Sequence, residues 1–247
     1  IFLIETIFDT LNAKAAIYAI KQVLKEKNKD IPIMLSVTLS DKSGRTLSGQ
    51  TLEAFYYSVE FANPLSIGLN CSLGIKDMIP YIEELGTYTK FRISLYANAG
   101  LPNAFGEYEQ TPEMMAEGYR ELAQKGLLNI CGGCCGTTPE HINAIYNAVK
   151  DITPHTVSNI ENYQSYSGLE PFVYNGNQNF VMVAERTNVT GSKKFARLVN
   201  EHKFDEALEI AREQIENGAN IIDINMDSDL SISKDLMIEF LNLIASE

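Results

Sequence analysis

The sequence predicts an α/β protein with two partial (β/α)8 barrels of the triosephosphate isomerase type, joined by an irregular linker. Short apolar runs alternate with amphipathic stretches, at a spacing of about 30 residues, through the first 150 residues. The alternation stops at Asp151 and resumes at Phe180. Each stretch holds too few βα units to close a barrel of eight strands.

The first region, residues 1–152, is predicted to form five strands that each lead into a helix. Helix 10–27 places Ala13, Ile17 and Ile20 on one face, at spacings of three or four residues. Threonine, proline and glutamate in succession begin the helices at 111 and 138, because they supply an N-cap, a first-turn proline and an acid near the positive end of the helix. The expected strands are 1–4, 31–38, 65–69, 91–97 and 128–130, and the other expected helices are 52–61 and 76–86. Consecutive strands joined by helices indicate a parallel sheet with right-handed crossovers.

The second region begins after a polar stretch. Residues 153–179 are rich in Asn, Ser, Tyr and Gly, and we expect an interdomain linker there. Residues 180–247 then show the alternation again, with expected strands 180–184 and 221–224 and helices 204–217 and 233–247. This pattern predicts two or three βα units.

Composition limits the function classes. The 247 residues carry a net charge of −12 without a basic stripe, so we expect no nucleic acid and no anionic lipid as partner. The apolar runs are shorter than the roughly 18 residues that span a bilayer. Four cysteines are too few for a disulfide scaffold, which favours a reducing compartment and a cytoplasmic location. The chain begins at Ile1 inside an apolar run, and we expect a piece of a longer protein.

Three cysteines follow two predicted strands. Cys71 comes after strand 65–69, and Cys134 and Cys135 come after strand 128–130. Active sites of βα folds lie at the carboxyl ends of parallel strands. Adjacent thiolates on a glycine-rich turn, with a third from a neighbouring strand, would form a zinc site with three thiolate ligands and one open position. Such a site suits capture of a substrate thiol as thiolate, which then accepts an electrophilic group such as methyl.

Other interpretations of the cysteines remain open at this point. Free cysteines are often buried hydrophobic residues, and we assign Cys131 to the core for that reason. Cys131 and Cys134 also form a CxxC pattern, which by itself indicates a redox pair only weakly.

At these residues the sequence resembles a known family. The motifs LNCSLG, YANAGLPNAFGEYE and GGCCGTTPEHI resemble the second half of the homocysteine-binding barrel of cobalamin-dependent methionine synthases. The resemblance extends into the folate-binding module of that family through GRTLSGQT, SGLEPF, ERTNVTGSKKFARL, GANIIDINMD and FLNLIASE. It therefore covers nearly the whole chain.

The resemblance implies a set of ligands and site residues in the first region. It implies that Cys71, Cys134 and Cys135 bind Zn²⁺ and that homocysteine sulfur takes the fourth position. Glu5 matches an acid that holds the homocysteine amino group, and a carboxylate suits an ammonium partner. Asn98 matches a residue that occupies the open zinc position in some members of the family, where a thiolate can displace it.

In the second region the resemblance implies a site for 5-methyltetrahydrofolate. Gly191, Ser192 and Lys193 match the loop after the first strand of the folate barrel. Asn188 and Asn225 have amides that could face a pterin ring, and Asp223 is a candidate of the same kind. The sequence departs from the family pattern at Ala184, Asp229 and Ile232, near this loop.

The family's remaining parts lie outside this chain. The resemblance implies methylcobalamin as a cofactor, bound by a cobalamin module of the same parent polypeptide, and a reactivation module beyond it. Because strands expected before Ile1 and after Glu247 are absent, we expect the isolated chain to be inactive in methyl transfer, marginally stable and prone to aggregation.

Two alternatives accompany this hypothesis. One is a stand-alone zinc-dependent homocysteine S-methyltransferase that uses another methyl donor, which would not need the region after Asp151. The other is a zinc-binding scaffold without catalysis, although structural zinc sites normally carry four protein ligands.

Overall fold

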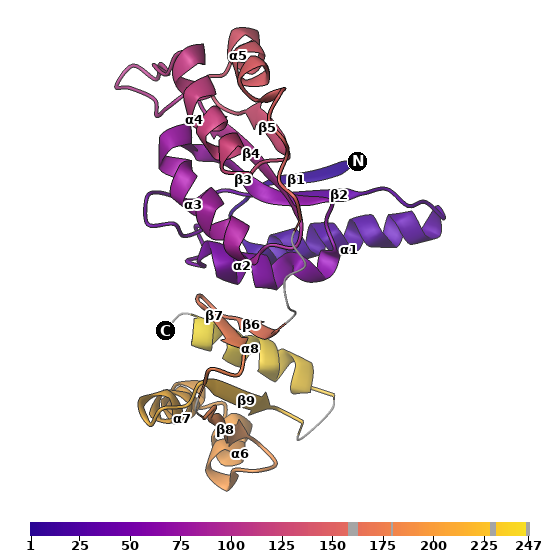
Figure 1. Cartoon of the computed structure of the whole chain (residues 1–247). Helices are drawn as coiled ribbons and strands as arrows, with labels where there is room; N and C mark the ends of the chain where they lie inside the picture. The colour runs from indigo at the N-terminus through magenta and orange to yellow at the C-terminus, as the bar shows by residue number, and fades with distance from the viewer. Residues whose placement is uncertain (158–162, 179, 228–230, 246–247) are drawn as a thin grey trace. The chain divides into compact units, whose positions relative to one another are not determined.

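The structure is a computed structural model, and it describes residues 1–157, 163–178, 180–227 and 231–245. The chain divides into two compact units, Ile1–Tyr174 and Asn175–Glu247. Figure 1 gives the order of the elements along the chain.

The first unit is built on a parallel five-stranded sheet. The strands follow one another in space in the same order as in the sequence, and a helix leads from each strand to the next (Figure 1). Its strands are β1 (Phe2–Ile7), β2 (Ile33–Val37), β3 (Ser66–Gly74), β4 (Arg92–Asn98) and β5 (Ile130–Gly133). The predicted α/β class with parallel strands is confirmed.

The helices of the first unit begin within one residue of their predicted starts. They are α1 (Thr10–Glu26), α2 (Leu52–Val59), α3 (Ile75–Tyr88), α4 (Pro112–Gln124) and α5 (Pro139–Val149), with a short 3-10 turn at Glu60–Ala62. Thr111 caps α4 by accepting the backbone N–H of Met114. Alternate strand residues such as Leu35, Ile67 and Ile93 are buried against these helices and form the core.

A hairpin lies inside the stretch 153–179, where we expected a linker. It consists of β6 (Gln164–Ser167) and β7 (Pro171–Tyr174), which pair antiparallel. Its turn is fastened to the start of α2, because Gln50 Nε2 donates to the Gly168 carbonyl at 2.9 Å and Ser167 Oγ donates to the Ala54 carbonyl at 2.8 Å. The hairpin therefore belongs to the first unit.

Among its described residues, the second unit has two parallel strands and three helices. In chain order these are β8 (Val183–Asn188), α6 (Lys193–Asn200), α7 (Phe204–Glu216), β9 (Ile221–Asn225) and α8 (Ser233–Ala245). Phe195, Phe204 and Phe240 pack together in its core. Strand β8 begins three residues later than the predicted strand 180–184, because the polar residues that follow Ala184 pair with β9. Helix α6 was not predicted.

Within the described part of the chain, none of the helices is both long and apolar enough to span a bilayer. Asp229, one of the departures from the family pattern, lies outside the described residues, and Ile232 lies at the turn that leads into α8.

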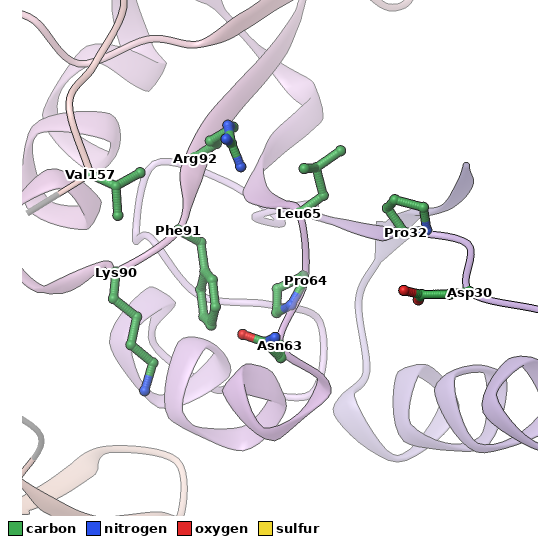
Figure 2. A pocket seen from close by; sticks show the side chains of 9 residues that line it. All are labelled: Asp30, Pro32, Asn63, Pro64, Leu65, Lys90, Phe91, Arg92 and Val157. Carbon is green, nitrogen blue, oxygen red and sulfur yellow. The ribbon is translucent and has the colours of Figure 1, made fainter.

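A pocket of about 710 Å³ lies at the amino ends of β2, β3 and β4 (Figure 2). Pro32, Leu65 and Arg92 contribute to its lining from the starts of these strands. The cysteines lie at the opposite ends of the strands, so this pocket is separate from them.

Candidate metal centre

Cys71 lies inside β3 and not after it, which corrects the predicted strand 65–69. Cys71 and Ser72 have φ angles of 60° and 66°, and the pairing of β3 with β4 is irregular between Asn70 and Gly74. Residues other than glycine enter this left-handed region at a cost of about 1–2 kcal/mol each. The bulge interrupts the alternation of side chains along β3 at Cys71.

Hydrogen bonds hold the strained pair on both sides. The residue before Cys71 is Asn70, which is 1% exposed. Its Oδ1 accepts the backbone N–H of Thr6 at 2.9 Å and the hydroxyl of Ser36 at 2.7 Å. On the other side, Ser72 Oγ donates to the Ser40 carbonyl at 3.1 Å. No role was predicted for Asn70, although a lone amide within an apolar strand is a signal of a buried hydrogen-bonding position.

The second group of thiols lies on a turn that is tied to the end of β4. The Cys134 N–H donates to the Ala97 carbonyl at 2.9 Å, and the Cys135 N–H donates to Asn98 Oδ1 at 3.0 Å. The Ala99 N–H returns a hydrogen bond to the Cys135 carbonyl at 2.9 Å. Both backbone donors of the cysteine pair are thus satisfied by β4 and the residue at its end.

Two glycines around the cysteine pair are required by close contacts. A Cβ atom on Gly133 would lie 2.5 Å from Thr137 Cγ2, and one on Gly136 would lie 2.3 Å from Tyr108 Cγ. Gly136 also has a φ of +75°, which favours glycine. These glycines let the turn pass close to its neighbours and bring the sulfur atoms toward β3.

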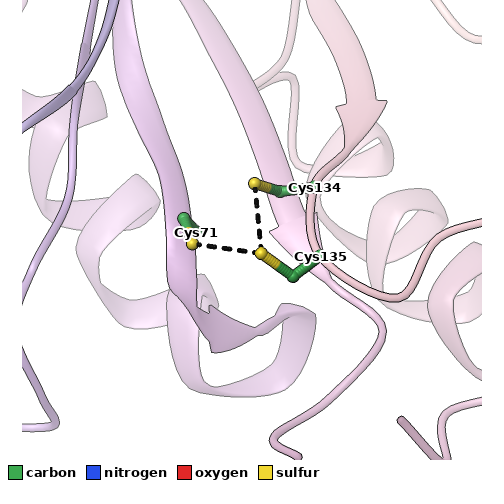
Figure 3. Close-up of side chains that lie close together, drawn as sticks. All are labelled: Cys71, Cys134 and Cys135. Carbon is green, nitrogen blue, oxygen red and sulfur yellow. Dashed lines mark hydrogen bonds between the residues drawn. The ribbon is translucent and has the colours of Figure 1, made fainter. Parts of the chain in front are cut away.

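The three sulfur atoms converge, as Figure 3 shows. Cys71 Sγ lies 3.6 Å from Cys135 Sγ, which lies 3.9 Å from Cys134 Sγ. All three atoms lie within 4.8 Å of one another. Tetrahedral zinc with Zn–S bonds of about 2.3 Å requires sulfur separations of about 3.8 Å. The donor set and its spacing therefore fit a thiolate-bound metal ion.

The raised pKa of Cys134 also indicates that a cation would be needed to hold these thiols as thiolates. Burial, followed by the proximity of Cys71 and Cys135, raises the pKa of Cys134 to about 12. Three thiolates at this spacing need a cation between them. Cys131 lies outside the cluster, packs against the core, and has a pKa raised to about 11 by burial. It is a protonated core thiol, in agreement with its assignment from sequence.

A tyrosine that sequence analysis did not single out lies beside the cluster. Tyr108 belongs to the loop between β4 and α4, and its ring lies so close to Gly136 that a Cβ atom there would be 2.3 Å from Tyr108 Cγ. Burial first, and then the neighbouring thiols, Cys135 foremost, raise the pKa of Tyr108. The hydroxyl is therefore protonated at neutral pH.

The loop of Tyr108 is held in place by His141. The His141 Nε2 atom lies 2.8 Å from the Gln110 carbonyl, which can only accept, so Nε2 carries the hydrogen. Nδ1 then accepts from the backbone N–H and the hydroxyl of Thr138 at 3.2 and 2.9 Å. His141 is 7% exposed and joins the start of α5 to the loop.

The two residues expected to bind homocysteine lie on β1 and β4. Glu5 is exposed on β1, and after burial its charge is among the causes that raise the pKa of Tyr96 on β4. Asn98 is 3% exposed, and its oxygen is engaged with Cys135 as described above. Their contact with a substrate stays a prediction.

The residues expected to bind folate lie at the carboxyl ends of β8 and β9. Asn188 Oδ1 accepts the N–H groups of Thr190 and Gly191 at 2.8 and 3.0 Å, and its Nδ2 donates to Asp223 Oδ2 at 3.2 Å. Ser192 caps α6, and Asn225 Oδ1 accepts a backbone N–H at 2.7 Å. Lys193 is exposed in the first turn of α6. Within the unit these residues shape the loops, and their contact with a pterin stays a prediction.

Comparison with known protein families decides the class of the first unit. The family model of homocysteine S-methyltransferases matches residues 1–149. The chain belongs to the homocysteine S-methyltransferase family. Residues 184–245 match a second model, that of pterin binding enzymes. The match to the second model coincides with β8 through α8.

Two solved structures of a family member are similar to this chain. The homocysteine methyltransferase MmuM from Escherichia coli in its apo form is 20% identical, with a TM-score of 0.43, over 59% of this chain and 48% of that chain. Its oxidized form is also 20% identical, with a TM-score of 0.45, over 59% of this chain and 44% of that chain. This chain thus spans less than half the length of either solved chain.

Proposed function

We propose that this chain is the part of a cobalamin-dependent methionine synthase that binds zinc, homocysteine and methyltetrahydrofolate. The observation that carries the proposal is the convergence of three thiols at zinc spacing in a homocysteine S-methyltransferase unit that is followed by a pterin-binding unit. The proposed domains are 1–152 for the zinc barrel and 180–247 for the start of the pterin barrel; within the predicted linker 153–179, the hairpin of β6 and β7 belongs to the first unit. Sequential parallel strands in the first unit support a partial (β/α)8 barrel.

The proposed roles follow from the chemistry of the side chains. Zn²⁺ held by Cys71, Cys134 and Cys135 would keep the homocysteine sulfur as a thiolate at neutral pH. Asn98 fixes the Cys135 backbone, and the negative Glu5 would hold the homocysteine ammonium group. Three thiolate ligands would leave the fourth tetrahedral position of a bound Zn²⁺ to the substrate sulfur.

The second unit would present the methyl source. Gly191, Ser192 and Lys193 would bind 5-methyltetrahydrofolate, with Lys193 meeting a glutamate carboxylate of that substrate. Asn188 and Asn225 would face the pterin ring. Methylcobalamin would be carried by a module outside this chain, and a reducing cytoplasm suits the free thiols.

Specific observations weigh against the alternatives. A stand-alone methyltransferase with another methyl donor does not need a unit that matches pterin binding enzymes, so residues 184–245 favour methionine synthase. A structural zinc scaffold normally has four protein ligands, whereas the cluster offers three among the described residues.

The test is metal analysis of the full chain with and without homocysteine. We expect one zinc per chain, lost in Cys134→Ser and retained in the matched control Cys131→Ser, because Cys131 is a core thiol outside the cluster. X-ray absorption at the zinc edge should gain one sulfur ligand when homocysteine is added. A bound zinc whose coordination ignores homocysteine would contradict the proposed enzyme and favour the scaffold.

The pterin half needs a separate measurement. Binding of 5-methyltetrahydrofolate to the full chain is measured by calorimetry, with Lys193→Ala as the variant and the exposed Lys234→Ala as its control. We expect weaker binding for Lys193→Ala only. Equal binding by both variants would remove Lys193 from the proposed site.

A further inference from the structure

Two strands of the first unit depart from regular β geometry where they carry residues of the proposed site. On β1, Glu5 and Thr6 together lie opposite the single residue Ser36 of β2, which makes this part of the strand a bulge. Thr6 has a φ angle of 56°, which is rare for a β-branched residue. On β3, the bulge described above contains Cys71. Both strands are therefore distorted where they bear a proposed ligand of the substrate or the metal.

Asn70 connects the two bulges. It precedes Cys71 on β3 and reaches β1 with both ends of its amide group. Its Oδ1 atom accepts the backbone N–H of Thr6 at 2.9 Å, and its Nδ2 atom donates to Thr6 Oγ1 at 2.9 Å. Oδ1 also accepts the hydroxyl of Ser36 at 2.7 Å, from strand β2 that lies between β1 and β3. Because Asn70 is only 1% exposed, water does not compete for these hydrogen bonds.

The bond to the Thr6 N–H fixes the peptide group that joins Glu5 to Thr6. Since a peptide group is planar, an acceptor that holds this N–H also sets the direction of the Glu5 carbonyl and the position of the Glu5 Cα atom. The bond to the Thr6 hydroxyl holds the same residue from its side chain. A residue in a strained conformation keeps it only where its surroundings fix it. The two bonds together therefore determine where the Glu5 side chain leaves the strand.

We propose that Asn70 is a positioning residue that sets the separation between the Glu5 carboxylate and the thiol cluster, and thereby selects thiols that carry an ammonium group at the matching distance. This inference rests on the proposed function, in which Glu5 binds the ammonium group of homocysteine and the zinc binds its sulfur. A short carbon chain joins that sulfur to that nitrogen, so both groups can bind at once only if their two sites are held at one separation. Asn70 begins beside a proposed metal ligand and ends on the peptide of the acid, so it provides this constraint.

The test compares two thiols that differ only in the ammonium group. L-Homocysteine and 4-sulfanylbutanoic acid share the same carbon chain, thiol and carboxylate. Calorimetry on the zinc-loaded full chain gives the Kd of each thiol. We expect the unchanged protein to prefer homocysteine by on the order of tenfold, because a hydrogen bond between charged groups stabilises a complex to about that extent. Glu5→Gln should abolish most of this preference, which gives the reference for a lost ammonium contact.

Two variants then remove parts of the Asn70 contact. Thr6→Val loses the bond from Asn70 Nδ2 at nearly the same side-chain volume, and Asn70→Ala loses both bonds to β1. We expect the preference for homocysteine to fall in Thr6→Val and to fall as far in Asn70→Ala as in Glu5→Gln. Thr6→Ser keeps the hydroxyl and should retain the preference. Ser36→Ala should retain it too, because this variant removes a bond to the same Asn70 oxygen from β2 and none from β1.

The ratio of the two Kd values separates positioning from a general loosening of the fold. Lost structure around the zinc weakens the binding of both thiols alike and leaves the ratio unchanged, whereas a displaced Glu5 weakens the binding of homocysteine alone. A preference retained by Thr6→Val, or by Asn70→Ala where that variant folds, would overturn this inference and leave the proposed function intact. An equal loss in Ser36→Ala would also overturn it. If the unchanged protein binds both thiols equally, Glu5 has no place in the proposed site, and if it binds neither, the proposed function fails as well.

Discussion

The side-chain oxygen of Asn98 accepts the backbone N–H of Cys135 at 3.0 Å. This bond joins the end of β4 to the turn that carries two of the three thiols, and Asn98 is buried, so water cannot easily replace it. The amide that the resemblance places near the substrate therefore also positions a candidate metal ligand. The position of Cys135 Sγ in the cluster therefore depends on the Asn98 side chain.

Asn98→Ala should weaken metal binding. The substitution leaves the Cys135 N–H without its acceptor at a partly buried position, which costs about 1 kcal/mol. We expect a lower zinc affinity, measured by competition with a coloured chelator. Asn147→Ala is the control, because Asn147 is an exposed amide on α5 that bonds only within its own helix. An unchanged affinity for Asn98→Ala would show that the turn keeps its shape without this bond.

Gly136→Ala should disrupt the centre more than an equivalent change elsewhere. Both Gly136 and Gly126 have positive φ angles, +75° and +71°, so each substitution strains the backbone by about 1–2 kcal/mol. At Gly136 the new Cβ atom also collides with Tyr108, whereas nothing lies within 4 Å of a Cβ atom at Gly126. Stability to urea and zinc content should therefore fall further for Gly136→Ala. Equal losses in the two variants would contradict the close contact with Tyr108.

The metal-free protein should lose stability as the pH rises above 9. Burial and the neighbouring thiols raise the pKa of Cys134 from its ordinary value of 9.0 to about 12 in the folded state. The unfolded chain then binds fewer protons than the folded chain between these values, so unfolding is favoured progressively from pH 9 to about 12. Urea unfolding of the metal-free protein at about pH 8 and about pH 10 measures the effect. The Cys131→Ala, Cys134→Ala double variant should lose less stability over this interval, since the pKa of Cys131 is raised in the same sense.

Gln50→Ala should loosen the hairpin from the first unit. Gln50 is 8% exposed, donates to Gly168 and accepts the Thr10 hydroxyl at 2.7 Å. Its loss removes the bonds that join the hairpin and α1 to this side chain, so limited proteolysis within β6 and β7 should become faster. Glu170→Gln is the control, because the ion pair of Glu170 with Arg45 is exposed and contributes little to stability. Faster cleavage of Glu170→Gln alone would show that the ion pair, and not Gln50, holds the hairpin on the first unit.

Much of the first unit could be predicted from local sequence signals. The threonine and proline pairs at 111 and 138 fixed the starts of α4 and α5, because N-capping and the proline ring act within a single turn. The apolar spacing of Ala13 and Ile17 indicated α1 and its buried face for the same local reason. The boundaries of β3 and β8 were wrong, since polar residues extend both strands and pairing with a neighbour outweighed their low apolar content.

The sequence by itself determined which residue types stand near the ends of the strands. It therefore determined that Cys71, Cys134 and Cys135 belong to the carboxyl-terminal side of a parallel sheet. Only the tertiary structure decided that their sulfur atoms meet at the spacing of zinc ligands, and that the ring of Tyr108 lies against Gly136 beside them. Those distances depend on a left-handed bulge in β3 and on hydrogen bonds from residues far apart in the chain, such as Asn70 with Thr6. Contacts of this kind arise from packing in three dimensions, and no local pattern of residues encodes them.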